Sequence, residues 1–252
     1  MDTMKKSYII FLISIFFILS LGVLTVEAEP ITVAINPDAK PFKYMDENGT
    51  YSGIDADVIN AIAEETGLEL EFVVMDFDQI LDAVTSCEVD AAISAFTKNE
   101  NREKMVLFSE PYLIGAQSTF VRIKNDSFKD ISDQNIKSIG TKTGTTSENA
   151  ARIISEMYNY EQKHYENYHD LFAALENDEI DAAISDEFLA KEFVDSYADI
   201  MTIGQPLTNE PYAIAVCPDN TELVNTLNTG LAAIQKSGKI DEIVLQNLMP
   251  GK

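Results

Sequence analysis

The chain has 252 residues and a formal net charge of −24, and it contains two cysteines and two histidines. This length allows either one large domain or two small ones with real hydrophobic cores. The negative charge excludes a nucleic-acid-binding protein, and so few cysteines and histidines provide no metal-ligand set with sensible spacing, so we expect no nucleic-acid partner, no metal and no cofactor.

Residues 1–28 have the features of a secretory signal peptide. Lys5 and Lys6 precede an apolar run over 8–26, and the sequence Val26-Glu27-Ala28 places small residues around a cleavage point before Glu29. The apolar run approaches membrane-spanning length, so an uncleaved N-terminal anchor stays open as an alternative. We expect an exported protein that is periplasmic or extracellular.

After the leader, short apolar runs alternate with segments of helical periodicity. Residues 113–123 are rich in β-forming residues and are long enough to cross between two lobes. The alternation predicts an α/β protein with largely parallel sheets. The expected strands are 31–35, 70–74, 137–140, 200–203 and 213–216, with a strand edge at 164–165, and the expected helices are 57–66, 99–105, 145–155, 188–194, 223–235 and 240–248.

One segment is repeated without a gap. Residues 77–94 (FDQILDAVTSCEVDAAIS) and 168–185 (YHDLFAALENDEIDAAIS) are identical at seven of eighteen positions. Each copy begins with an amphipathic helical pattern and ends in a short apolar strand. The repeat predicts two lobes built from the same helix-to-strand unit. Because ligands of open α/β sheets bind beyond the carboxyl ends of the strands, Ser94 and Ser185 are expected to face a crevice between the lobes.

Cys87 and Cys217 are the only cysteines. An oxidising exterior permits a disulfide between them, but buried unpaired thiols are an equal alternative, because nothing in the sequence shows that the two residues are close.

A series of short motifs extends over the whole mature chain. The most specific is VDAAISAFT at 89–97, followed five residues later by Arg102. In this order the motifs resemble the extracellular solute-binding proteins, family 3, which serve amino-acid ABC importers, and in particular the glutamine-binding type. The other matching motifs are KPF at 40–42, GIDADV at 53–58, MDF at 75–77, FSEPY at 108–112, KTGTT at 142–146, IDAAISD at 180–186 and PYAIAV at 211–216.

The resemblance implies a two-lobed, periplasmic-binding-protein-like (type II) α/β fold, with a ligand cleft between lobes that are joined by two hinge strands. On this basis residues 1–28 form the signal peptide, 29–114 the first part of lobe 1, 115–212 lobe 2, and 213–252 the segment that returns to lobe 1. The implied partners are a free amino acid and the membrane permease of an ABC importer, and the protein is expected to be a monomer.

The resemblance also implies how an amino acid is held. Arg102 would grip the α-carboxylate through its guanidinium fork, and Asp186 would accept the ammonium group. A helix starting at Thr145 and Thr146 would point free backbone N–H groups at the same carboxylate. No catalytic residue is expected. The complete set of expected ligand-binding residues is Asn36, Phe77, Ser94, Ala95, Thr97, Arg102, Lys142, Thr145, Thr146, Ser185 and Asp186.

Each of these roles has a simpler alternative. Arg102 lies in the sequence Asn-Arg-Glu-Lys, which is typical of a solvated surface. Asp186 is placed to cap the next helix, and Phe77 is an ordinary core residue in many helices. Thr145 and Thr146 also fit a helix cap, with Glu148 completing a capping box.

Three positions depart from the family pattern. Ala39 stands where many relatives place an aromatic ring against the ligand, and Asn36 stands where they often have an aspartate. Ser185 occupies a variable specificity position. A cationic ligand would meet Lys142 without a carboxylate at position 36, so we expect a polar or acidic amino acid in preference to arginine or lysine.

Two other functions share the same fold. The first is a periplasmic enzyme that resembles cyclohexadienyl dehydratases, which require a general acid in the cleft. The second is an extracellular ligand sensor, although the chain stops at Lys252 with no kinase, channel or second membrane segment. We expect a non-enzymatic binding protein, because the carboxylates of the cleft already have ligand-binding roles.

Overall fold

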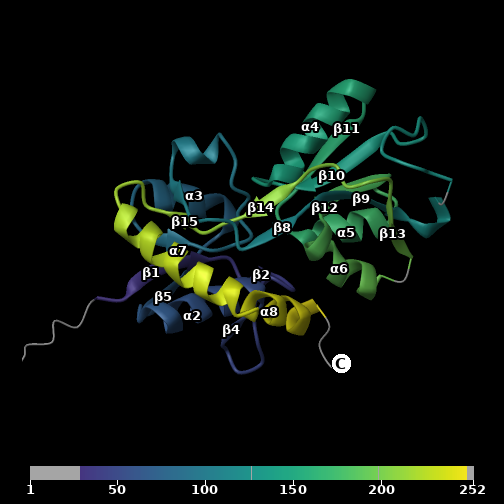
Figure 1. Cartoon of the computed structure of the whole chain (residues 1–252). Coiled ribbons are helices and arrows are strands. Elements are labelled where there is room, and N and C mark those ends of the chain that lie inside the picture. Colours follow the sequence, from purple (N-terminus) through teal and green to yellow (C-terminus); the bar gives the residue numbers. More distant parts are fainter. Residues whose placement is uncertain (1–28, 126, 198, 249–252) are drawn as a thin grey trace, which may run out of the picture.

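The structure is a computed structural model that describes residues 29–125, 127–197 and 199–248. It has two α/β lobes that lie side by side, as predicted (Figure 1). The expected signal peptide or anchor at 1–28 falls outside the described residues. Within the described ranges, no helix combines the length and the apolarity that a membrane span requires.

The first lobe is built on a five-stranded sheet with the order β5-β1-β6-β15-β7. Its β1 is parallel to β5 and β6, whereas β15 is antiparallel to β6 and β7. Helices α7 and α8 pack on α2 along the outside of this lobe, and α3 packs on β1 and β6 (Figure 1). The bounds are β1 Ile31–Ile35, β5 Leu70–Val74, β6 Ala91–Ala92, β7 Leu107–Phe108, β15 Ala215–Val216, α2 Ile54–Thr66, α3 Phe77–Thr85, α7 Thr221–Lys236 and α8 Lys239–Leu248.

The second lobe repeats this plan with the sheet order β11-β10-β12-β9-β13. Strand β10 is parallel to β11 and β12, and β9 is antiparallel to β12 and β13. Helix α4 covers one face of the sheet, and α5 and α6 cover the other (Figure 1). The bounds are β9 Gln117–Arg122, β10 Ser138–Lys142, β11 Glu161–Tyr165, β12 Ala182–Asp186, β13 Ile200–Ile203, α4 Thr146–Tyr158, α5 Tyr168–Glu176 and α6 Glu187–Ser196.

Two short antiparallel strands lie between the lobes. They are β8 (Leu113–Gly115) and β14 (Glu210–Tyr212), which pair with each other (Figure 1). The chain leaves the first sheet before β8 and returns to it after β14, so these strands are the crossing segments. We keep 29–114, 115–212 and 213–252 as the proposed ranges of the lobes. A small sheet of β2 (Asp38–Ala39), β3 (Lys43–Met45) and β4 (Tyr51–Ser52) completes the first lobe.

The sequence repeat corresponds to one structural unit in each lobe. In the first copy α3 leads to β6, and in the second α5 leads to β12. Both helices have nine residues and both pack on the strand that follows them. The unit therefore places the end of its strand at the same point of each lobe.

Three expectations about secondary structure were wrong in detail. The helix expected at 99–105 is only a 3-10 turn at Arg102–Lys104. Helix α2 begins at Ile54, three residues earlier than expected. Gly53 is the residue before its first turn, where it adopts a φ of 111°, and a Cβ there would lie 2.4 Å from the Phe42 carbonyl oxygen. The sheets are mixed, because the strands that follow each crossing between lobes run antiparallel to their neighbours.

The two cysteines form a disulfide. Cys87 follows α3 and Cys217 follows β15, and their Cα atoms are 5.1 Å apart. The bond closes a loop of 130 residues that contains the whole second lobe. Of the two alternatives that the sequence left open, the paired state is the one observed.

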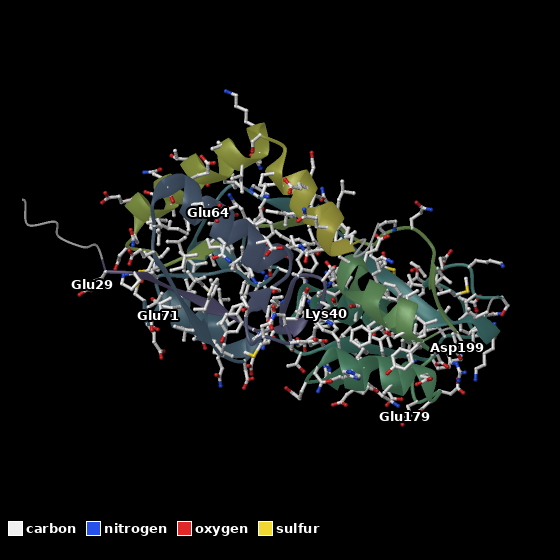
Figure 2. The ribbon with its side chains drawn as sticks, turned by 90° about the horizontal axis from the view of Figure 1, so that it is seen from below. Glu29, Lys40, Glu64, Glu71, Glu179 and Asp199 are labelled. Carbon is white, nitrogen blue, oxygen red and sulfur yellow. A yellow bond between two sulfur atoms is a disulfide. The ribbon has the colours of Figure 1, made fainter. Side chains whose placement is uncertain are left out.

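The acidic excess lies largely on the outside of both lobes. Figure 2 shows Glu64 and Glu71 extending from the first lobe and Glu179 and Asp199 from the second, with Lys40 near the junction. The core between the layers is apolar and includes fully buried Ile54, Ile59, Phe120 and Phe172. The surface charge therefore favours solubility and is not itself a binding site.

Candidate functional site

A cavity lined by residues of both lobes and of the crossing strand β14 lies at their junction. Nine of the eleven expected ligand-binding residues line it, and only Asn36 and Ser185 do not. The nine are Phe77, Ser94, Ala95, Thr97, Arg102, Lys142, Thr145, Thr146 and Asp186, and the others that line it are Lys43, Gln117, Ser147, Tyr168, Leu189 and Tyr212.

Arg102 provides a cation at one end of the cavity. The 3-10 turn that carries it is fixed by Asn99, whose Oδ1 accepts a hydrogen bond from the Arg102 backbone N at 3.0 Å. The guanidinium lies over the Phe96 ring at 5.0 Å, and its Nη1 donates to the Thr97 carbonyl oxygen at 3.1 Å. Burial lowers the pKa of Arg102, and Glu210 opposes that shift. The remaining N–H donors of the fork suit a carboxylate.

The N-terminus of α4 forms the facing wall. Thr145 caps the helix, and Thr145, Thr146 and Ser147 all line the cavity. Glu148 completes the predicted capping box at a shifted position, because its carboxylate accepts from the Gly144 backbone N at 2.8 Å. The first N–H groups of a helix have no partner within the helix and carry a partial positive charge. This wall therefore favours an anion, as expected.

A hydrogen-bond network among side chains at the cavity connects the two lobes. Glu210, in the crossing strand β14, accepts hydrogen bonds from the hydroxyl of Thr97 at 2.5 Å and from that of Thr146 at 3.0 Å. The Gln117 amide donates to Thr146 Oγ1 at 3.2 Å and accepts from the Ser147 hydroxyl. Gln117 and Glu210 were not predicted as site residues, because both lie in β segments without a recognisable motif.

Asp186 lies at the end of β12 and has two roles. Its Oδ1 caps α6 by accepting hydrogen bonds from the backbone N of Phe188 at 2.8 Å and of Leu189 at 3.1 Å. Its Oδ2 is buried and has no hydrogen-bond partner. Burial raises the pKa of Asp186 to about 7, and the two backbone hydrogen bonds oppose this shift. The helix-cap role and a ligand-binding role are therefore compatible, because they use different oxygens.

Two aromatic rings and a lysine also line the cavity. Phe77 stacks on Phe96 with ring centroids 5.0 Å apart, and it lines the cavity as well as the core. The Lys142 Nζ lies 5.5 Å from the Phe77 ring centroid and 4.8 Å from that of Tyr168, and it pairs with Asp38 Oδ2 at 2.8 Å. Tyr168 was missed, although it occupies the same position in the second repeat as Phe77 in the first.

Ser94 and Ser185 do not behave alike. Ser94 lines the cavity, whereas Ser185 is fully buried and its hydroxyl has no hydrogen-bond partner. Successive side chains of a strand point to opposite faces, so the orientation of Asp186 toward the cavity directs Ser185 away from it. The expectation that both serines face the crevice was therefore wrong for Ser185.

Asn36 lies beside the cavity and not in it. It lines a neighbouring cavity together with Phe77 and Lys142. Its amide Nδ2 donates to the Met75 carbonyl oxygen at 3.2 Å, while its Oδ1 is buried without a hydrogen-bond partner. The two cavities share Phe77 and Lys142 among their lining residues.

Comparison with known proteins decides the family. Residues 31–249 match the sequence profile of the bacterial extracellular solute-binding proteins, family 3. The chain belongs to this family. The arginine-binding periplasmic protein of Mannheimia haemolytica is 30% identical over 226 residues, which cover 88% of this chain and 92% of that protein. The members of the family are extracellular, in agreement with the expected export.

Two solved structures resemble this solute-binding protein closely. An ancestral arginine-binding protein bound to arginine has a TM-score of 0.81 and 33% identity, covering 87% of this chain and 98% of that one. The ancestral amino acid-binding protein AncCDT-1, a precursor of cyclohexadienyl dehydratase, has a TM-score of 0.79 and 30% identity, covering 87% and 95%. Both likenesses extend over the two lobes, and both of these proteins are amino-acid-binding proteins.

Proposed function

We propose that this protein captures a polar L-amino acid between its lobes and delivers it to the membrane permease of an ABC importer. The observation that carries the proposal is the pairing of complementary charges in one cavity. Arg102 and the N-terminus of α4 suit a carboxylate, and the unpartnered Oδ2 of Asp186 suits an ammonium group. A free α-amino acid has both groups on one carbon.

The ligand side chain is proposed to extend toward Lys142, Phe77 and Tyr168, which line the cavity. Lys142 lies between Phe77 and Tyr168, where a ligand side chain would extend, and Asn36 lines the neighbouring cavity. A cationic side chain would meet the Lys142 ammonium at this end. Two of the relatives named above are arginine-binding proteins, but the charge of this cavity favours glutamine, glutamate or another polar residue over arginine and lysine.

We also propose that the ligand closes the lobes. Arg102 belongs to the first lobe, whereas Asp186 and the N-terminus of α4 belong to the second. Only a closed arrangement lets one small molecule contact both, so the ligand stabilises that arrangement by its differential affinity. The protein is proposed to act as a monomer, and X-ray scattering should show a smaller radius of gyration when the ligand is added.

The test is a thermal-shift panel of the twenty L-amino acids and their D-enantiomers, followed by calorimetry on each hit. A ligand that binds only the folded state raises the melting temperature as its concentration increases. We expect stabilisation by at least one polar L-amino acid, with a dissociation constant on the order of micromolar or lower. A panel without a stabilising amino acid would contradict the proposal.

An enzyme on the same fold is the alternative, and one observation favours it. Asp186, with a pKa of about 7, has the acidity of a general acid. However, the capping hydrogen bonds to its Oδ1 and the ammonium-binding role of its Oδ2 leave no surplus carboxyl group, so we propose binding without turnover. Incubation with a 4-hydroxycyclohexadienyl carboxylic acid followed by mass spectrometry separates the two, because aromatisation expels the ring hydroxyl and the ring carboxylate and so lowers the substrate mass by one water and one carbon dioxide.

A further inference from the structure

Lys43 is a buried cation that the binding residues described above do not include. It lies in β3, it is 2% exposed, and it lines the same cavity as Arg102 and Asp186. Its Nζ donates one hydrogen bond, to the Ser94 carbonyl oxygen at 3.3 Å, and lies 5.8 Å from the Phe77 ring centroid. An ammonium group has three donors, so its hydrogen-bonding capacity is only partly used.

No carboxylate within the described ranges forms an ion pair with Lys43. Burial lowers the pKa of Lys43, and the charges of Asp55, Asp38 and Asp186 oppose this shift. Asp55 accepts hydrogen bonds from the Ala95 backbone N at 2.8 Å and from the Tyr112 hydroxyl at 2.5 Å. Asp38 pairs with Lys142. The Lys43 ammonium therefore lacks a direct ion pair and keeps donors that an incoming anion can engage.

We propose that Lys43, together with Lys142, binds the side-chain carboxylate of an acidic L-amino acid such as L-glutamate, and that Lys43 determines this specificity. The inference rests on the proposed function, because Arg102 and Asp186 hold the α-carboxylate and the ammonium group. The two lysines border the cavity beside Phe77, whose ring lies near both ammonium groups. The two lysines thus add two cations to the lining of the cavity, and Asp38 is the carboxylate that forms an ion pair with one of them, Lys142.

Arginine is the informative competitor. The neighbouring cavity, which shares Lys142 and Phe77 with the first, is lined by four acids: Asp38, Asp76, Asp78 and Glu166. A long cationic side chain that displaced Lys142 from Asp38 would reach these carboxylates. In the observed arrangement Lys142 pairs with Asp38, and Lys43 adds a second positive charge to the lining of the first cavity. The proposal therefore predicts that arginine binds more weakly than glutamate.

The experiment compares L-glutamate, L-glutamine and L-arginine by calorimetry on three proteins. These are the wild type, Lys43→Met, which keeps the apolar stem but removes the ammonium, and the matched control Lys40→Met. Lys40 is exposed, and its Nζ lies 4.8 Å over the Tyr44 ring. The wild type and Lys40→Met should prefer glutamate over glutamine by about tenfold or more, and Lys43→Met should reduce that ratio to roughly threefold or less without weakening glutamine.

The outcomes distinguish the inference from the proposed function. Tighter wild-type binding of glutamine or arginine than of glutamate would overturn the inference, while amino-acid binding itself would still support the function. An unchanged ratio in Lys43→Met would overturn the role of Lys43. Binding of no amino acid at all would remove both. Circular dichroism and melting temperature establish that each variant is folded. If Lys43→Met does not fold, the ratio of glutamate affinity to glutamine affinity is measured on Lys43→Gln instead.

Discussion

Asp186 makes ligand binding dependent on pH in a direction that follows from its burial. An ammonium group needs the ionised carboxylate, but burial raises the pKa of Asp186 to about 7. Below that pH the free protein holds the carboxyl in its protonated form, so binding must release a proton. Affinity should therefore be highest above pH 8 and should weaken as the pH falls through 7.

The magnitude follows from the size of the shift. Each pH unit below the pKa reduces the ionised fraction tenfold, which corresponds to about 1.4 kcal/mol. At pH 5, two units below a pKa of about 7, the dissociation constant should be roughly a hundredfold higher than at pH 8, a loss of about 2.7 kcal/mol. Asp55, whose pKa burial raises to about 6, does not line the cavity, so it contributes no direct contact with the ligand.

The assay is calorimetry with L-glutamine from pH 5 to pH 8.5, because no group of this ligand titrates in that interval. Repeating each titration in two buffers of different ionisation enthalpy measures the protons released, about 0.5 per binding event at pH 7. Asp186→Asn should bind weakly at every pH and lose the slope. A wild-type dissociation constant that stays constant from pH 5 to pH 8, with no proton release, would refute the reasoning.

Three further outcomes are expected. Arg102→Lys should weaken binding by roughly 2–4 kcal/mol in calorimetry, because an ammonium cannot reproduce the guanidinium fork, while Arg152→Lys on the exposed face of α4 should not change it. Replacing Cys87 and Cys217 by alanine should lower the free energy of unfolding by about 5 kcal/mol in guanidinium titrations, since the disulfide closes a loop of 130 residues; equal stability of the oxidised and reduced wild type would contradict this. The ligand-free protein should melt at a higher temperature near pH 5 than near pH 8, because the native state, with the raised pKa values of Asp55 and Asp186, binds more protons than the unfolded state between about pH 4 and pH 7; the double variant Asp55→Asn/Asp186→Asn should reduce that difference.

The features that local sequence encodes were the ones that could be predicted. The repeated unit, the helix cap at Thr145 and the helix cap at Asp186 are set by residues close in the chain, and the structure has all three. Ser185 shows the limit of this approach, because the two repeats align in sequence while the strand alternation assigns one serine to the cavity and the other to the interior.

The residues that were missed depend on contacts between distant segments. Lys43 donates to the carbonyl oxygen of Ser94, which lies 51 residues later in the chain. The Glu210 carboxylate accepts a hydrogen bond from the Thr97 hydroxyl, 113 residues earlier in the chain. The disulfide depends likewise on the proximity of α3 and β15. Because charged residues are mostly exposed, their neighbours in sequence predict a solvated side chain. The burial of Lys43 and Glu210 depends on segments that are distant in sequence, so it is evident only in the folded structure.

Glu210 gives the protein a means of tuning affinity without altering its contacts to the ligand. Its carboxylate holds a hydroxyl from each lobe, so it stabilises the arrangement in which the lobes share one cavity. An apparent dissociation constant equals the intrinsic one divided by the fraction of molecules that are competent to bind. Substitutions at such a crossing-strand residue would thus change the concentration at which the protein fills, and the rate at which it releases its cargo, while leaving the choice of amino acid unchanged.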